Sequence, residues 1–373
     1  MGKLVQNVFR KACTIYAKGY YPSLTVKRYW SKNNPVYSGD LAHPKILKNY
    51  LLRELDGLTA KGAVISIKKS RPVVSYLDPQ IINKIDDLNF NLLNKKLFLF
   101  SPERTEFSVN RLEHYCGVKA EVFKNYIILT NYQMHLDLFA QYFKGNVIIG
   151  RTDAQMPSQH CQLSATDGIS IINIGVGPSN AKTITDHLAV LKPDAIIMIG
   201  HCGGLRNHQE IGDYVIATGF VRDDLVLDAI IPIEVPIIPH HIVNCTIMRE
   251  LEEQKLNYRL GSIFITTADR NWELNYDKYL KRFSLSRAVA VDMESATVAT
   301  NCFKYRIPFA TILCVSDKPL HGKLKQNHTA QKFYAQSKQK HLEMAINTIK
   351  KLANSYKEGL PSTTIRGYYD PIL

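Results

Sequence analysis

Short apolar runs rich in β-branched residues alternate with segments of helical spacing through most of the chain after about residue 165. Runs of the first kind predict buried strands, and apolar residues repeated every three to four positions predict helices. Regular alternation of the two is typical of a three-layer α/β domain, in which helices cover both faces of a sheet. The predicted strands are 169–174, 194–199, 213–220, 260–266, 288–291 and 308–315, and the predicted helices are 180–191, 295–304 and 330–353.

The chain before residue 145 follows a less regular pattern, which predicts a smaller α+β unit. A chain of 373 residues is also longer than one hydrophobic core usually supports. We therefore predict two domains, 1–145 and 146–373, with residues 1 to about 19 loosely held. The first domain is predicted to contain helices at 44–57, 105–115 and 131–143 and strands at 63–67, 98–100 and 126–130.

The composition indicates a soluble globular protein, with 45% hydrophobic and 21% charged residues. No run approaches the ~18 apolar residues that a membrane span needs. The net charge of +14 favours anionic partners, and because Lys and Arg are scattered, we expect small phosphorylated molecules rather than nucleic acid. The seven cysteines include no CxxC pair, which indicates reduced thiols in a cytoplasmic protein and no zinc site.

Carboxylates follow two of the predicted strands in the segment 287–319. Asp292 and Glu294 come after the first strand and Asp317 after the second. We expect these strands to be parallel and joined by a helix, so that their carboxyl ends meet at the edge where ligands bind in open α/β sheets. Two acids in one crevice can bind hydroxyl groups and transfer protons. Alternatively, Asp292 or Glu294 only caps the helix N-terminus.

Glycine-rich segments follow two other predicted strands. GVGPSN at 175–180 lies between a strand and a helix, where glycines let the backbone approach an anion and the helix N-terminus favours its charge. A plain tight turn is the alternative, since the segment does not read GxGxxG. GHCGG at 200–204 follows the next strand and is expected to reach the same edge of the sheet.

Several motifs occur in the order typical of the nucleoside phosphorylase and nucleosidase superfamily. Within that superfamily the chain resembles the bacterial AMP nucleosidases. The motifs are NIGVGPSNAK at 173–182, IGHCGGLR at 199–206, IGDYV at 211–215, RDD at 222–224, DRNWEL at 269–274, VDMESA at 291–296 and VSDKP at 315–319. Further traces of the family fall in the first domain, among them YPSLTV at 21–26 and LTNY at 129–132.

The resemblance implies a three-layer catalytic domain with a twisted mixed sheet and the hydrolysis of AMP to adenine and ribose 5-phosphate. It implies that the chemistry needs no metal or cofactor, that the protein is a homohexamer, and that MgATP activates and phosphate inhibits it. The first domain resembles the regulatory domain of that family in a shortened form. A packing and oligomerisation role is an equal alternative for it, since fold resemblance does not fix function.

The resemblance also assigns roles to individual residues. Asp317 fits the position that donates a proton to N7 of the purine, which stabilises the departing base. Met293 and Glu294 fit positions that contact the ribose, with the carboxylate accepting hydrogen bonds from its hydroxyl groups. Trp272 is the candidate for stacking on the purine. The other candidates are placed on the ribose or phosphate side and are Gly177, Ser179, His201, Arg222 and Arg270.

Two positions favour water over phosphate as the nucleophile. Hexameric purine nucleoside phosphorylases carry an Arg and a Ser that bind the attacking phosphate, where this chain has Met198 and His201. A purine nucleoside phosphorylase and a nucleosidase for unphosphorylated adenosine derivatives stay open as alternatives. So does an inactive relative that senses nucleotides, although the presence of Glu294 and Asp317 speaks against it.

Overall fold

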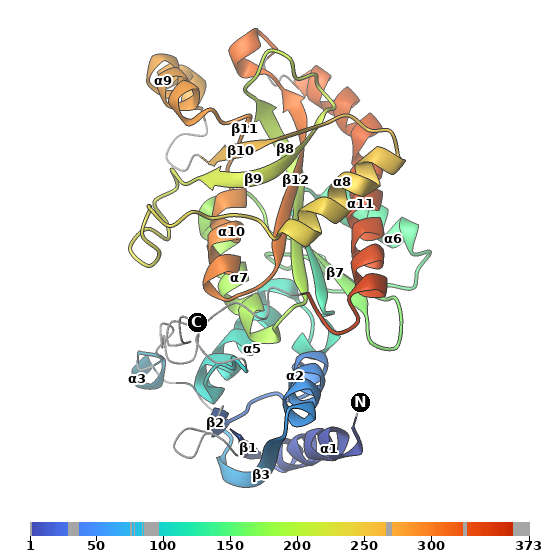
Figure 1. Ribbon diagram of the computed structural model, residues 1–373. Helices are drawn as coiled ribbons and strands as arrows, with labels where there is room; N and C mark the ends of the chain where they lie inside the picture. Colours follow the sequence, from blue (N-terminus) through green and yellow to red (C-terminus); the bar gives the residue numbers. More distant parts are fainter. Residues whose placement is uncertain are drawn as a thin grey trace.

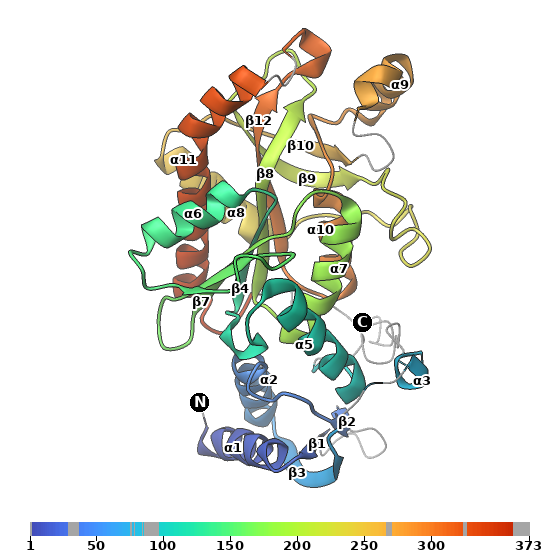
Figure 2. The same cartoon turned by 180° about the vertical axis from the view of Figure 1, so that it is seen from behind.

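The computed structural model describes residues 2–28, 37–74, 77, 79–83, 85, 97–265, 271–323 and 327–360. Within them the chain forms two units, each built on its own sheet. Figure 1 and Figure 2 show the smaller unit, which contains the N-terminus, at the lower end of the molecule and the larger unit above it. In this described part, no helix is both long and apolar enough to cross a membrane.

The smaller unit is a three-stranded antiparallel sheet covered by two helices. Its central strand β1 (Tyr20–Arg28) pairs with β2 (Tyr37–Asp40) and with β3 (Ala63–Pro72). Helices α1 (Lys3–Ala17) and α2 (Lys48–Ala60) pack on this sheet and on each other around a shared apolar core. The mixture of strands and helices predicted for this region is confirmed.

Residues 3–17 form a packed helix, which corrects our expectation of a loosely held N-terminus. Val5, Val8 and Ala12 are buried, and their spacing of three and four residues places them on one helical face. The basic residues Arg10 and Lys11 are exposed. Their charge gave the segment the composition of a loose tail, although the apolar spacing is helical.

The predicted strand at 98–100 is wrong. Phe98 and Phe100 are buried, as the apolar run suggested. However, the backbone N–H of Phe98 donates to the hydroxyl of Tyr50 at 2.9 Å rather than to a neighbouring strand. This segment therefore packs against α2 as irregular chain; in the sequence it lies between the short helix α3 (Pro79–Ile82) and the longer helix α5 (Pro102–Cys116).

The larger unit is built on a mixed nine-stranded sheet with the order β11-β10-β9-β12-β8-β4-β7-β6-β5. The predicted three-layer α/β class is confirmed, and each strand predicted after residue 165 is present with shifted ends. The strands are β4 (Tyr126–Thr130), β5 (Ile148–Ile149), β6 (Ser158–Gln162), β7 (Gly168–Asn173), β8 (Ala195–Gly204), β9 (Tyr214–Val221), β10 (Tyr258–Ile265), β11 (Ala290–Asp292) and β12 (Phe309–Asp317).

Strand β4 differs from our domain assignment, which placed it in the first unit. It lies inside the large sheet, parallel to β7 and β8, and α6 (Gln133–Tyr142) packs against the same sheet. All five residues of β4 are buried because the strand is covered on both faces. We therefore propose a domain boundary just before β4 rather than at residue 145.

Helices cover both faces of the large sheet (Figure 1). On one face α5, α7 and α10 enclose one apolar core, and on the other α6, α8 and α11 enclose a second. The sequence did not predict α8 or α9. Besides α5 and α6, the helices on this sheet are α7 (Pro178–Leu188), α8 (His241–Glu253), α9 (Tyr276–Ser286), α10 (Ser295–Lys304) and α11 (Asn327–Ser355). Short 3-10 turns lie at η1 (Ala120–Val122), η2 (Ala189–Leu191), η3 (Trp272–Asn275) and η4 (Pro319–His321).

The large sheet closes on itself at the carboxyl end of β8, because β11 pairs there with β8 as well as with β10. Strand β12 runs parallel to β8, whereas β11 pairs antiparallel with its last residues, Gly203 and Gly204. Our expectation that β11 and β12 are parallel is therefore wrong. A Cβ on Gly203 would lie 3.1 Å from Val291, and one on Gly204 would lie 2.9 Å from Val315, so the glycines allow both strands to approach β8.

Candidate active site

A cleft with about 1050 Å³ of empty space, open to solvent, lies at the carboxyl ends of β8, β11 and β12. Asp292, Glu294 and Asp317 all line it, and each is less than a tenth exposed. The structure thus brings the three acids of the segment 287–319 together, through the closure of the sheet rather than through parallel neighbouring strands.

Glu294 is fixed by a hydrogen bond to each carboxylate oxygen. The backbone N–H of Gly177 donates to Oε1 at 2.6 Å, and Asn131 Nδ2 donates to Oε2 at 3.0 Å. Gly177 has φ of 106°, a backbone conformation that favours glycine and turns its N–H toward the carboxylate. Donors on both oxygens hold the carboxylate in one orientation at the cleft.

Asp317 is the last residue of β12, where the pairing with β8 shifts register between Val315 and Asp317. An irregularity of this kind re-aims a side chain at the end of a strand. The hydroxyl of Ser316 lies 2.5 Å from Oδ1 of Asp317 and is in position to donate to it. This places a buried, hydrogen-bonded carboxyl group at the wall of the cleft.

Asp292 performs the capping role that the sequence left open. Its Oδ2 accepts the backbone N–H groups of Ser295 and Glu294, and its Oδ1 accepts the hydroxyl of Ser295. Burial raises the pKa of Asp292 to about 6, even though these hydrogen-bond donors oppose the shift. We conclude that Asp292 anchors the first turn of α10 and so positions the adjacent Glu294.

Three further predicted residues line the cleft, namely Met293, His201 and Trp272. His201 is 7% exposed and meets the ring of Tyr132 edge-on at 4.6 Å between centroids. Trp272 is 5% exposed and packs edge-on against Phe283 at 4.9 Å, so its ring forms part of the cleft wall and of an apolar cluster behind it.

The other predicted residues lie elsewhere. Gly177 stands behind Glu294, and Ser179 is exposed in the first turn of α7 and is not among the residues that line the cleft. Arg222 is buried away from the cleft, where its guanidinium donates to the carbonyl groups of Ile231 and Pro232. Arg270 lies outside the described residues.

Asn131 and Tyr132 were not among our predicted site residues, although both line the cleft. They follow β4, which joins β8 in the large sheet, and this brings Asn131 within hydrogen-bond distance of Glu294. Both residues stand in the motif LTNY at 129–132, which resembles the family and could have identified them. We misread it because we placed this segment in the first domain.

The described residues contain no group of three or more His, Cys, Asp and Glu side chains arranged to hold a metal ion. The arrangement in the cleft suits acid–base chemistry. One carboxylate is fixed where it can accept hydrogen bonds from hydroxyl groups, and a second carboxyl group, at the end of another strand, can exchange a proton with a bound molecule.

Comparison with known families places this geometry in context. The family described as the phosphorylase superfamily matches residues 126–355. The AMP nucleosidase of Escherichia coli strain K12 is 36% identical to this chain, in an alignment that covers 94% of this chain and 88% of that protein. The matched family begins at β4, in agreement with the extent of the larger unit.

Solved structures give the same fold. The AMP nucleosidase from Bacteroides thetaiotaomicron VPI-5482 superimposes with a TM-score of 0.58 at 28% identity, over 68% of this chain and 99% of that one. The 5'-methylthioadenosine/S-adenosyl homocysteine nucleosidase of Campylobacter jejuni superimposes with a TM-score of 0.54 at 18% identity, over 61% of this chain and all of that one. At that identity the second match supports the fold alone.

Proposed function

The chain belongs to the AMP nucleosidase family of the phosphorylase superfamily, and from this premise we propose how its cleft breaks the N-glycosidic bond of AMP. The reaction adds water across the bond between the ribose and the purine and gives adenine and ribose 5-phosphate. The observation that carries the assignment of the cleft is the meeting of Glu294 and Asp317 there, from two separate motifs.

Asp317 is the general acid in this proposal. When the bond breaks, its electron pair moves onto the purine, and a proton delivered to N7 neutralises the departing base. The position of Asp317 at the cleft wall supports this role, as does the Ser316 hydroxyl that holds its carboxyl group. Water then bonds to the anomeric carbon of the ribose and loses a proton.

Glu294 binds the ribose in this proposal. Its carboxylate accepts hydrogen bonds from the 2'- and 3'-hydroxyl groups, and its negative charge stabilises the oxocarbenium character that the ribose gains in the transition state. The support is the pair of donors, Gly177 N–H and Asn131 Nδ2, that fix it at the cleft. Met293, the preceding residue, packs on the ribose.

The remaining contacts follow from the walls of the cleft. We propose that Trp272 packs on the purine and that His201 faces the 5'-phosphate, because both line the same cleft as Glu294. Arg270 and Ser179 are proposed for the phosphate side on the family resemblance alone. No role in substrate binding is proposed for Arg222, whose guanidinium is engaged by backbone carbonyl groups.

The experiment that tests the function is product analysis by chromatography after the protein is incubated with AMP, with and without inorganic phosphate, and with adenosine in parallel. Adenine and ribose 5-phosphate from AMP without added phosphate is the expected result. Cleavage of adenosine only with phosphate, yielding ribose 1-phosphate, would make the protein a phosphorylase, the first alternative. Binding of AMP without any cleavage would favour an inactive nucleotide sensor.

Assembly and regulation are further proposals that rest on the family resemblance. We propose a cytoplasmic homohexamer that acts in purine nucleotide salvage, is activated by MgATP and is inhibited by phosphate. The alignment with the Escherichia coli relative covers 94% of the chain and so extends into the first unit, which supports a shared role for that unit. Native mass spectrometry measures the subunit number, and initial rates with and without MgATP test the activation.

A further inference from the structure

The motif RDD at 222–224 has no part in the proposed reaction, although it is one of the motifs by which the chain resembles its family. The motif follows directly on β9, which ends at Val221. These three described residues are not among those that line the cleft, and Arg222 and Asp224 are less than a tenth exposed. Burying charged side chains costs free energy unless they are paired. Their contacts therefore show what the motif holds in place.

Arg222 closes the loop that leaves β9. Its guanidinium donates to the carbonyl group of Ile231 at 3.0 Å and to that of Pro232, and it lies 3.8 Å from the carboxylate of Asp228. These contacts tie the start of the segment 222–232 to its end. The two acids that follow Arg222 therefore project from a loop that is fixed at both ends.

Asp224 binds α10, the helix that begins directly after Glu294. The hydroxyl of Thr297, in the first turn of this helix, donates to Oδ2 of Asp224, and both residues are buried. Burial is the main cause of the raised pKa of Asp292, and the negative charge of the nearby Asp224 adds to it. The first turn of α10 is thus held by an acid from β9 as well as by its own capping acid.

Asp223 binds the helix behind another wall of the cleft. Its Oδ1 accepts a hydrogen bond from the guanidinium of Arg282 on α9, which also lies 5.7 Å from the ring centroid of Phe264. The next residue of α9, Phe283, packs against the ring of Trp272 at 4.9 Å between centroids. Because Trp272 lines the cleft, this ion pair fixes the helix that supports the tryptophan.

We propose that the RDD segment positions two walls of the cleft, and that its two acids act on different halves of the substrate. Asp224 positions Glu294 through α10, and hence the ribose. Asp223 positions Trp272 through α9, and hence the purine. The assignment of the two halves rests on the proposed function. Because the acids are neighbours in the chain, the segment also sets the spacing between the ribose and purine walls.

The first test compares two buried threonines of α10. Thr297→Val keeps the shape of the side chain and removes the hydroxyl that binds Asp224. Thr300→Val is the matched control, because the Thr300 hydroxyl donates to the carbonyl group of Ala296 in the same helix. In Thr297→Val, kcat for AMP and the affinity for ribose 5-phosphate should each fall about tenfold, the effect of one hydrogen bond to a charged group, with the affinity for adenine unchanged. Thr297→Ser keeps the hydroxyl and should restore most of kcat.

The second test changes the partner of Asp223. Arg282→Met should lower the affinity for adenine about threefold, since an ion pair at the surface is weak, and should leave the affinity for ribose 5-phosphate unchanged. Lys281→Met is the matched control, because Lys281 is the exposed neighbour on the same helix. With Trp30→Phe in every variant, Trp272 is the one tryptophan of the chain. Its fluorescence emission should shift in Arg282→Met and in neither Lys281→Met nor Thr297→Val.

Initial rates with AMP and titration calorimetry with adenine and with ribose 5-phosphate measure these effects. If the wild type cleaves AMP and Thr297→Val loses no more than Thr300→Val, the inference alone is overturned. Equal weakening of both ligands by Thr297→Val or by Arg282→Met would also overturn it, because a general loss of structure has that effect. A wild type that binds both ligands without cleaving AMP would reject only the proposed hydrolysis, since the two affinities still test the positions. A wild type that binds neither ligand would overturn both.

Discussion

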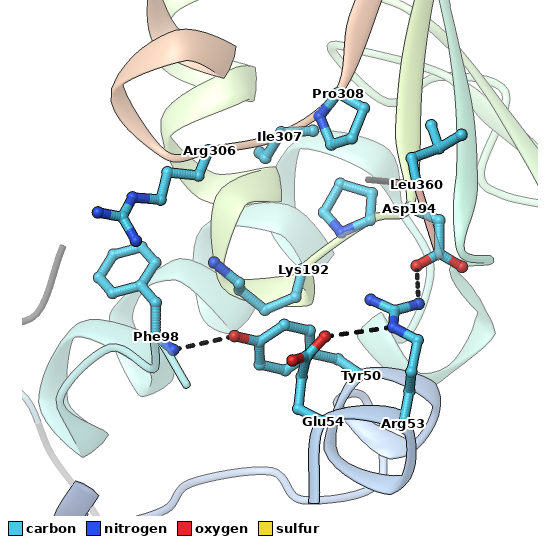
Figure 3. Close-up of a pocket in the computed structure, with 11 residues that line it drawn as sticks. Tyr50, Arg53, Glu54, Phe98, Lys192, Asp194, Arg306, Ile307, Pro308 and Leu360 are labelled. Atoms are coloured by element: carbon cyan, nitrogen blue, oxygen red, sulfur yellow. Dashed lines mark hydrogen bonds and ion pairs between the residues drawn. The ribbon is translucent and has the colours of Figure 1, made fainter. Parts of the chain in front are cut away.

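The active-site cleft and the cavity between α2 and the segments that lead into β8 and β12, which we name the junction cavity (Figure 3), lie at opposite ends of these two strands. At the carboxyl ends, Asp292, Glu294 and Asp317 line the cleft, and Glu294 is held by donors on both oxygens. At the amino ends, Arg53 pairs with both Glu54 and Asp194, and Lys192 is buried beside the rings of Phe98 and Tyr50. The carboxyl ends are thus suited to a cationic transition state, whereas the amino ends hold a buried amine next to paired charges.

The comparison teaches that burial acts in opposite directions at the two ends. In the cleft it raises the pKa of Asp292 to about 6, and in the junction cavity it lowers the pKa of Lys192 to about 7. In both cases the charged form is disfavoured. The two ends should therefore respond separately to mutation and to pH, and the following predictions test that separation.

The largest effect is expected at the acid end of β12. Asp317→Asn keeps the shape of the side chain but removes the proton that the departing purine needs. We expect kcat for AMP hydrolysis to fall by about 10²–10⁴-fold while AMP still binds. Initial rates and equilibrium binding measure the two quantities. The matched change at the other end, Lys192→Met, should leave kcat within about twofold. Near-normal turnover by Asp317→Asn would refute its role as general acid.

A smaller loss is expected for Glu294→Gln, which preserves shape but replaces one oxygen by an NH₂ group. That group then faces either the Gly177 N–H or Asn131 Nδ2, both of which are donors. Loss of a charged hydrogen bond of this kind costs about 1.5–3 kcal/mol, so kcat/KM for AMP should fall by about 10–100-fold. Glu273→Gln is the control, because Glu273 is exposed at the rim of the same cleft. Equal kcat/KM for wild type and Glu294→Gln would exclude the proposed ribose contact.

Asn131 positions Glu294 in our description, so Asn131→Ala should lower kcat/KM by about tenfold, the effect of one hydrogen bond to a charged group. A double-mutant cycle with Glu294→Gln separates positioning from a merely structural role. If Asn131 acts through Glu294, the second change should cost less in the variant background than in the wild type. Fully additive losses would mean that Asn131 acts independently of this carboxylate.

The difference between the two ends also explains how much could be predicted from the sequence. Glu294 and Asp317 stand in short contiguous motifs after apolar strands, and the class of the larger unit follows from its alternating pattern. Asn131 was missed because its contact with Glu294 depends on which strands pair, which local pattern does not specify. The opposite direction of β11 was missed because it depends on the approach that Gly203 and Gly204 permit to β8.

The junction cavity gave no signal in the sequence at all. Its basic residues, Arg53, Lys192 and Arg306, come from three segments more than a hundred residues apart, and lysine and arginine are residue types usually found on the surface. Only the packing of α2 against the entry to β8 and β12 shows that Lys192 is buried. The last prediction, which concerns the pH dependence of stability and has the smallest expected effect, depends on that burial.

The last prediction is that each end controls one part of the pH dependence of stability. Asp292 binds its proton more tightly in the folded state, so the free energy of unfolding should fall as the pH rises from about 4 to about 6. Lys192 binds its proton more weakly in the folded state, so the same quantity should rise as the pH increases from about 7 toward 10. Denaturant titrations of the wild type at several pH values measure both slopes.

Two variants show which residue causes each of the two slopes. Asp292→Asn keeps an acceptor for the first turn of α10 and should flatten only the acidic window, whereas Lys192→Met keeps the apolar stem and should flatten only the neutral-to-basic window. Each difference from the wild type should be on the order of 1 kcal/mol across its window, since relaxation reduces the full effect of a shifted pKa. If Lys192→Met left the basic slope unchanged, its amine would not be held in the low-dielectric surroundings that the junction cavity requires. If Asp292→Asn altered both slopes equally, the two ends would be coupled through β8 and β12 rather than independent.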